Sequence, residues 1–179
     1  MDINSGLDNV VMTRFRKTIL NLFVGLFLLT IIVLINWRFQ PTLFIHLGYS
    51  VVFIIGLTTR EPRLFVGVFM GFMGSQFIAG FDQSSLIISM LASLVYIFMS
   101  MTVISETKRT LQNVTLVVIG ALLWLVGLSL MEFFLGSPLA WFEVVLNNAI
   151  VLVVNSVVAL IITPLVQYIR DSVPRRLEG

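Results

Sequence analysis

The chain has 179 residues, of which 58% are hydrophobic and only 11% are charged, whereas about a quarter of the residues of soluble domains are charged. The mean hydropathy of +1.04 and the absence of cysteine exclude a soluble enzyme, a nucleic-acid-binding module and a disulfide-stapled secreted domain. The net charge is only +2. A membrane-spanning helix needs roughly 20 apolar residues, and the chain holds enough of them for about five or six spans.

Six apolar segments follow one another along the chain, separated by short polar stretches. The first begins after residues 1–17 and is too long for a cleavable signal peptide. We therefore predict an all-α integral membrane protein, a single transmembrane domain over residues 1–179 with a six-helix transmembrane bundle. The predicted spans are residues 19–37, 42–57, 64–80, 86–105, 114–135 and 141–166, with cytoplasmic tails at 1–17 and 170–179.

The second and third segments are short, and they could form a re-entrant hairpin instead of two spans. Arg60, Glu61 and Arg63 would then lie at the hairpin tip inside the bilayer, where each charge costs several kcal/mol. Two short spans in a locally thinned bilayer are the better interpretation. A loop is expected at residues 82–85 and a turn at residues 136–138.

The positive charges favour one side of this arrangement. With six spans and the N-terminus inside, Arg38 is the only one of the eleven Lys and Arg residues on the outer side. The other ten fall on the inner side: Arg14, Arg16, Lys17, Arg60, Arg63, Lys108, Arg109, Arg170, Arg175 and Arg176. Because cytoplasmic loops carry an excess of Lys and Arg, we expect both termini in the cytoplasm and the loops near Ser84 and Ser137 outside.

The remaining boundary residues agree with this orientation. The acidic side chains of the outer side are Asp82, Glu132 and Glu143. Trp37 and Trp141 lie at predicted outer boundaries and Tyr168 at an inner one, where aromatic belts occur in membrane proteins.

Few groups could carry chemistry, and we expect no enzyme, cofactor or metal site. The single histidine, His46, could be a proton relay or a ligand contact. A relay needs an acidic partner and no Asp or Glu lies at the centre of a span, so an interfacial histidine is the better interpretation. Glu132 could bind a cation or hold Arg38, but we expect it to snorkel to the nearby interface.

The third segment repeats small residues every four positions, which places them along one helix face. Such a face lets another helix approach closely, either within the bundle or from a partner protein, and packing within the bundle is the commoner case. We expect Gly71→Leu to separate the packed helices and Gly71→Ala to be far milder. The face comprises Gly67, Gly71, Ser75 and Ala79, and Gly74 and Gly80 add room beside it.

The sixth segment carries three asparagines, Asn147, Asn148 and Asn155, which should face protein because amides are costly in lipid. Gln76 and Ser75 lie at a depth that could pair with them. The expected result is an interhelical hydrogen-bond cluster, and the alternative is a small polar binding pocket. Pro164 could kink the last turns of this segment.

Two stretches resemble the rod shape-determining MreD family, namely residues 64–101, with the spaced glycines, and residues 145–176, with Asn148, Asn155 and Pro164. Members of that family commonly carry an aspartate where Ser75 or Gln76 stands here. The resemblance implies a scaffold in the bacterial inner membrane, bound to an MreC-like single-span partner and, through it, to the MreB filament and wall-synthesis enzymes.

The MreD fold is similar to that of the substrate-binding S-components of energy-coupling-factor vitamin transporters, which are the alternative function. S-components usually present small residues on their first helix to the transport partner, whereas the first segment here surrounds a lone Gly25 with bulky residues. The outer loops are also very short. Both features favour the scaffold, for which we expect no stabilisation by vitamins.

Overall fold

The computed structural model describes residues 16, 18–34, 47–59, 61–79, 83–102, 109–136 and 140–172. The all-helical prediction is confirmed, because these residues form six α-helices and one short 3-10 helix and contain no strand. The elements are the N-terminal helix Thr18–Leu34, α2 Gly48–Thr59, η1 Pro62–Leu64, α3 Phe65–Ala79, α4 Gln83–Met101, α5 Arg109–Phe134 and α6 Trp141–Ser172.

Three of these helices are long and apolar enough to cross a membrane, which supports a membrane protein. They are Ser84–Met101 within α4, Thr110–Phe134 within α5 and Trp141–Ile169 within α6. The N-terminal helix and α2 are apolar but shorter. The helices also differ from the predicted segments at several ends. The expected loop at residues 82–85 is wrong for residues 83–85, which form the start of α4, and α6 continues through Pro164 to Ser172.

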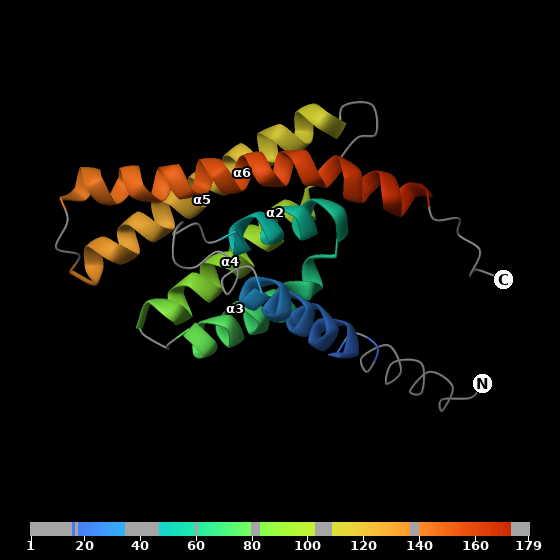
Figure 1. Ribbon diagram of the computed structural model, residues 1–179, viewed down its shortest axis with the longest axis horizontal. Coiled ribbons are helices and arrows are strands. Elements are labelled where there is room, and N and C mark those ends of the chain that lie inside the picture. Colours follow the sequence, from blue (N-terminus) through green and yellow to red (C-terminus); the bar gives the residue numbers. More distant parts are fainter. Residues whose placement is uncertain are drawn as a thin grey trace, which may run out of the picture.

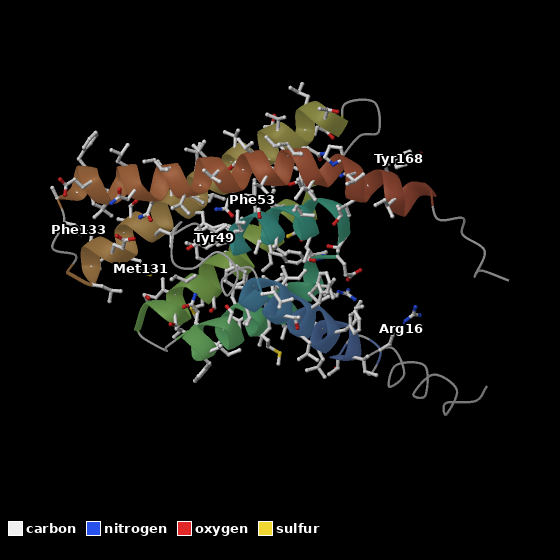
Figure 2. The ribbon with its side chains drawn as sticks, in the orientation of Figure 1. Arg16, Tyr49, Phe53, Met131, Phe133 and Tyr168 are labelled. Carbon is white, nitrogen blue, oxygen red and sulfur yellow. The ribbon has the colours of Figure 1, made fainter. Side chains whose placement is uncertain are left out.

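The helices pack in successive layers (Figure 1), with α5 and α6 side by side at the top of the view. Below them α2 contacts both α6 and α4, and α3 packs on α4 at the lower edge. Figure 2 shows Arg16 and Tyr168 toward one end of the molecule and Met131 and Phe133 toward the other. Arg16 and Tyr168, which the predicted topology assigns to the inner side, therefore lie toward the same end.

A cluster of aromatic rings from three helices forms the centre of the core. Trp124 of α5 is fully buried, and its ring centroid lies 4.3 Å from that of Tyr49, 5.8 Å from that of Phe53 and 6.2 Å from that of Phe72. Tyr49 and Phe53 belong to α2 and Phe72 to α3. Rings at these separations stabilise one another beyond their apolar burial, so this cluster fixes α2 against α3 and α5.

The helix α2 runs beside only the second half of α6. Its backbone N–H at Ser50 donates to the side-chain oxygen of Asn155, at 2.8 Å, and Asn155 lies about 21 Å along α6 from Trp141 at 1.5 Å per residue. At the other end of α2, the amide of Gln167 lies 3.5 Å from the carbonyl oxygen of Leu57. With 12 residues, α2 is about 18 Å long, shorter than the roughly 30 Å hydrocarbon core of a bilayer.

Candidate functional site

The small-residue face of α3 is covered by the chain's own N-terminal helix. A methyl group at Gly67 would lie 2.5 Å from the carbonyl oxygen of Asn21, and one at Gly71 would lie 2.7 Å from Cβ of Leu28. Gly25 faces the same contact, since a methyl group there would lie 3.1 Å from the carbonyl oxygen of Gly67. The glycines therefore bring two backbones into contact, as small residues do between helices in lipid.

A hydrogen bond reinforces this contact. The side-chain oxygen of Asn21 accepts the backbone N–H of Gly67 at 3.0 Å. Ser75, farther along the face, donates its hydroxyl to the carbonyl oxygen of Phe72 at 2.7 Å within its own helix. The side chain of Ala79, and Gly80, lie outside the described residues.

The expected cluster of Gln76, Asn147, Asn148 and Asn155 is divided among separate surroundings. Asn155 is fully buried, and its amide donates to the carbonyl oxygen of Val151 at 2.8 Å while its oxygen accepts the N–H of Ser50. Asn147 is exposed on α6. The reason is that α6 packs on α5 and α2 whereas α3 packs on α4, so the amides of α6 bond to α2 and α5 rather than to Gln76 and Ser75.

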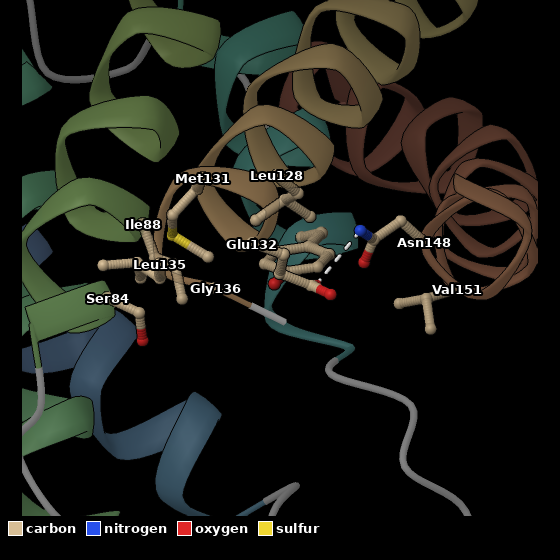
Figure 3. A pocket seen from close by; sticks show the side chains of 10 residues that line it. Ser84, Ile88, Leu128, Met131, Glu132, Leu135, Gly136, Asn148 and Val151 are labelled. Atoms are coloured by element: carbon tan, nitrogen blue, oxygen red, sulfur yellow. Dashed lines mark hydrogen bonds between the residues drawn. The ribbon is translucent and has the colours of Figure 1, made fainter. Parts of the chain in front are cut away.

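Asn148 joins Glu132 in a cavity of about 450 Å³ between the C-terminal end of α5 and the N-terminal parts of α4 and α6. We call it the Glu132 cavity (Figure 3). The amide nitrogen of Asn148 donates to Oε1 of Glu132 at 3.1 Å. The lining residues are Tyr49, Ser84, Ile88, Leu128, Met131, Glu132, Leu135, Gly136, Asn148 and Val151. Because α2 begins only beside Asn155, its Tyr49 bounds this space instead of filling it.

A second, smaller cavity of about 180 Å³ adjoins the first. It shares Tyr49, Ser84 and Ile88 with the Glu132 cavity and adds Ser75 and Gln76 of α3. Ser75 and Gln76 of the third segment and Asn148 of the sixth thus line neighbouring spaces, whereas Asn147 and Asn155 line neither.

The position of Glu132 differs from the expected snorkelling side chain. It is half-buried and lines the cavity, where it is held by Asn148. One turn later, two residues after α5 ends at Phe134, Gly136 has a φ of +78°, a left-handed conformation that glycine adopts without strain. Of the predicted turn at residues 136–138 only Gly136 is described; it is a turn residue as expected, and with Leu135 it lines the cavity.

Several residues that the sequence did not single out contribute to these contacts. Tyr49 and Ser84 line both cavities, and Asn21 lies inside the first predicted span. Near the other end of the bundle, the amide nitrogen of Asn113 lies 3.4 Å from the side-chain oxygen of Gln167. An isolated polar residue in or beside a predicted span was the available signal for Asn21, Asn113 and Gln167.

Other predicted residues lie outside the description, namely His46, Trp37, Arg38 and Asp82. The described residues contain no group of three His, Cys, Asp or Glu side chains that could hold a metal ion. Trp141 and Tyr168 are both exposed, at opposite ends of α6.

Comparison of the chain with known protein families, curated proteins and solved structures finds no match, so the functional interpretation depends on the residues and their geometry.

Proposed function

We propose that the chain is a scaffold component of the bacterial cell-shape machinery, a six-span protein of the inner membrane with both termini in the cytoplasm. It binds an MreC-like single-span membrane protein and is connected through it to the MreB filament and the wall-synthesis enzymes. The resemblance of residues 64–101 and 145–176 to the MreD family supports this proposal. So does one feature of α6, which offers a place for the partner.

That feature is the side-chain amide of Asn147, which lies on an exposed face of α6. The helix α6 is the least buried of the three candidate membrane spans, and its outward side is formed by large apolar residues such as Leu146, Ile150 and Val153. Asn147 is exposed among them, about 9 Å along the helix from Trp141. An amide without a partner in hydrocarbon costs several kcal/mol, whereas a neighbouring helix can satisfy it.

The partner proposed for this face is a single membrane-spanning helix whose soluble part lies over the outer end near Glu143. The small-residue face of α3 is not used for it, because the N-terminal helix covers Gly67 and Gly71. Docking on α6 leaves the bundle intact, since only outward side chains take part.

Site-specific photo-crosslinking in native membranes tests this proposal. A photoreactive residue at Ile150, which is 56% exposed, should capture a single-span protein with a periplasmic domain. The same residue at Leu152, which is 2% exposed, is the matched control and should capture none. Depletion of the protein should turn rod-shaped cells round. Unchanged cell shape, or capture of an ATPase pair in place of the single-span protein, contradicts the scaffold.

The alternative, an S-component of a vitamin transporter, is favoured by the size of the Glu132 cavity, which is in the range of small-molecule sites. Against it, the one glycine of the N-terminal helix, Gly25, faces α3, and the outward side of that helix carries Phe23, Leu26 and Phe27. A ligand at a hundredfold excess over Kd stabilises its protein by about 2.7 kcal/mol. We expect thiamine, riboflavin and biotin to leave the thermal midpoint unchanged, and a reproducible rise favours the transporter.

A further inference from the structure

An apolar groove of about 380 Å³ runs along the contact between α3 and α4, two helices that lie side by side (Figure 1). We call it the α3–α4 groove. Its lining residues are Phe65, Val66 and Phe69 of α3 and Met90, Ser93, Leu94 and Ile97 of α4. The α4 residues belong to a candidate membrane span, and Met90 and Leu94 are exposed. In a bilayer the groove therefore opens toward lipid.

The floor of the groove is fixed and offers a ligand little polar surface. Among the described lining residues Ser93 alone is polar, and it is buried. Its hydroxyl donates within the protein, since its oxygen lies 3.0 Å from the carbonyl oxygen of Ser89 and 3.3 Å from that of Phe65. The second contact ties α4 to the start of α3. A groove of this kind suits a hydrocarbon occupant.

The rim of the groove favours a flexible chain over a helix. It is formed by large exposed side chains, namely Phe65, Val66, Met90 and Leu94. Helices in lipid associate through small residues, and the glycines of α3 face the N-terminal helix instead. Along α4 the lining extends over two turns, about 10 Å. An acyl chain can follow so short a groove between bulky side chains, whereas a spanning helix cannot approach its floor.

A positive charge stands at one end of the groove. Arg63 is exposed and belongs to η1, which leads directly into α3. It precedes Val66 of the lining by three residues, and side chains three apart are neighbours on a helix surface. A guanidinium binds phosphate through parallel N–H groups, and its five donors suffice for a phosphate beside another partner. Residues 60–63 hold two arginines and one glutamate, so this segment is basic.

We propose that the α3–α4 groove binds an anionic phospholipid, with one acyl chain along Phe69 and Leu94 and the headgroup phosphate at Arg63. Each basic residue beside a membrane helix raises the affinity for anionic lipid about fivefold. The inference goes beyond the scaffold function, because the groove contains no residue of α6, the helix on which we place the partner.

Nanodiscs that contain equal amounts of phosphatidylglycerol and phosphatidylcholine test the headgroup. Native mass spectrometry of the released full-length protein should show preferential retention of phosphatidylglycerol. Arg63→Gln should reduce this preference about fivefold. Arg16→Gln is the matched control, because it removes the same charge from the N-terminal helix, which contributes no residue to the described lining. It should retain phosphatidylglycerol as the unchanged protein does.

Phosphatidylglycerol with a photoreactive diazirine in one acyl chain tests the groove itself. Illumination should label Phe69 and Leu94 more than Leu26, which is exposed on the N-terminal helix and reports ordinary contact with lipid. Val66→Trp keeps Arg63 and fills part of the groove, so it should lower both the labelling of Leu94 and the retention of phosphatidylglycerol.

Retention of phosphatidylglycerol that depends on Arg63, with labelling concentrated on the groove, supports the proposal. Equal retention of the two lipids, an equal loss in Arg16→Gln, or uniform labelling of Leu94 and Leu26 overturns it. Capture of a second copy or of another protein by a photoreactive residue at Leu94 also overturns it, because the groove is then a protein interface. Crosslinking from Ile150 is measured separately, so the scaffold proposal and the lipid site can fail independently.

Discussion

Two helix contacts in this protein differ in how closely the helices approach each other. Where the N-terminal helix crosses α3, glycines on both helices bring the backbones together and leave no room for a methyl group at Gly67 or Gly71. Between the C-terminal end of α5 and the N-terminal parts of α4 and α6, larger side chains line a cavity of about 450 Å³ around Glu132. Lipid supplies no hydrophobic drive between helices, so close backbone contact holds the first region and a hydrogen bond holds the second.

The comparison predicts that substitutions in the glycine contact have the largest effect on stability. Gly71→Leu should lower the free energy of unfolding by on the order of 3 kcal/mol or more, since overpacking of a tight contact costs about 1–3 kcal/mol and even a methyl group there meets Leu28 and the carbonyl oxygen of Gly25. Unfolding in mixed detergent micelles measures the change. Unaltered stability would mean that the two helices do not pack.

The structure also changes the expectation for alanine at these glycines. Because the opposing atoms at Gly67 and Gly71 include backbone oxygens, Gly67→Ala and Gly71→Ala should each cost about 1–3 kcal/mol and are not mild. Gly74→Ala is the matched control, as its methyl group meets only the flexible end of the Leu29 side chain. We expect it to be close to neutral, and equal effects at all three sites would contradict close backbone contact.

The buried cap of α2 should rank next. Asn155→Ala removes the shorter of the two hydrogen bonds of the Ser50 N–H, which also donates to the carbonyl oxygen of Leu47 at 3.1 Å. It also leaves a cavity where a fully buried side chain stood, so we expect a loss of about 1–2 kcal/mol. Micellar unfolding of Asn155→Ala and of the exposed control Asn147→Ala separates the two roles, because the control should not change the stability of the isolated protein. Similar losses in both variants would argue against the cap.

A smaller effect is expected where α2 meets η1. The hydroxyl of Tyr96 donates to the carbonyl oxygen of Glu61 at 2.7 Å and lies 2.9 Å from the hydroxyl of Thr59. Tyr96→Phe should therefore reduce the free energy of unfolding by about 0.5–1.5 kcal/mol. Tyr168→Phe, at a side chain that is 72% exposed, provides the comparison and should leave stability unchanged.

The smallest stability effect should come from the cavity. Glu132→Gln keeps an oxygen for the amide of Asn148 at a half-buried position, so we expect a change within about 1 kcal/mol. Circular dichroism melts check this value. A loss of stability as large as that of Gly71→Leu would show that Glu132 holds the bundle together. It would contradict the prediction that the glycine contact contributes more to stability than the Glu132 cavity does.

Composition and spacing were enough to predict the helical membrane protein and the close approach along α3. Both depend on local properties, namely the apolar content of segments near spanning length and the recurrence of Gly67 and Gly71 on one helix face. The tertiary structure decided what the sequence left open: that the N-terminal helix fills the glycine face, that α2 starts only beside Asn155, and that Asn148 bonds to Glu132 rather than to Gln76. These outcomes depend on complementary shapes and hydrogen bonds between segments that are distant in the sequence. Hydropathy does not predict which helices pack together in lipid, because lipid is as apolar as the helix surfaces.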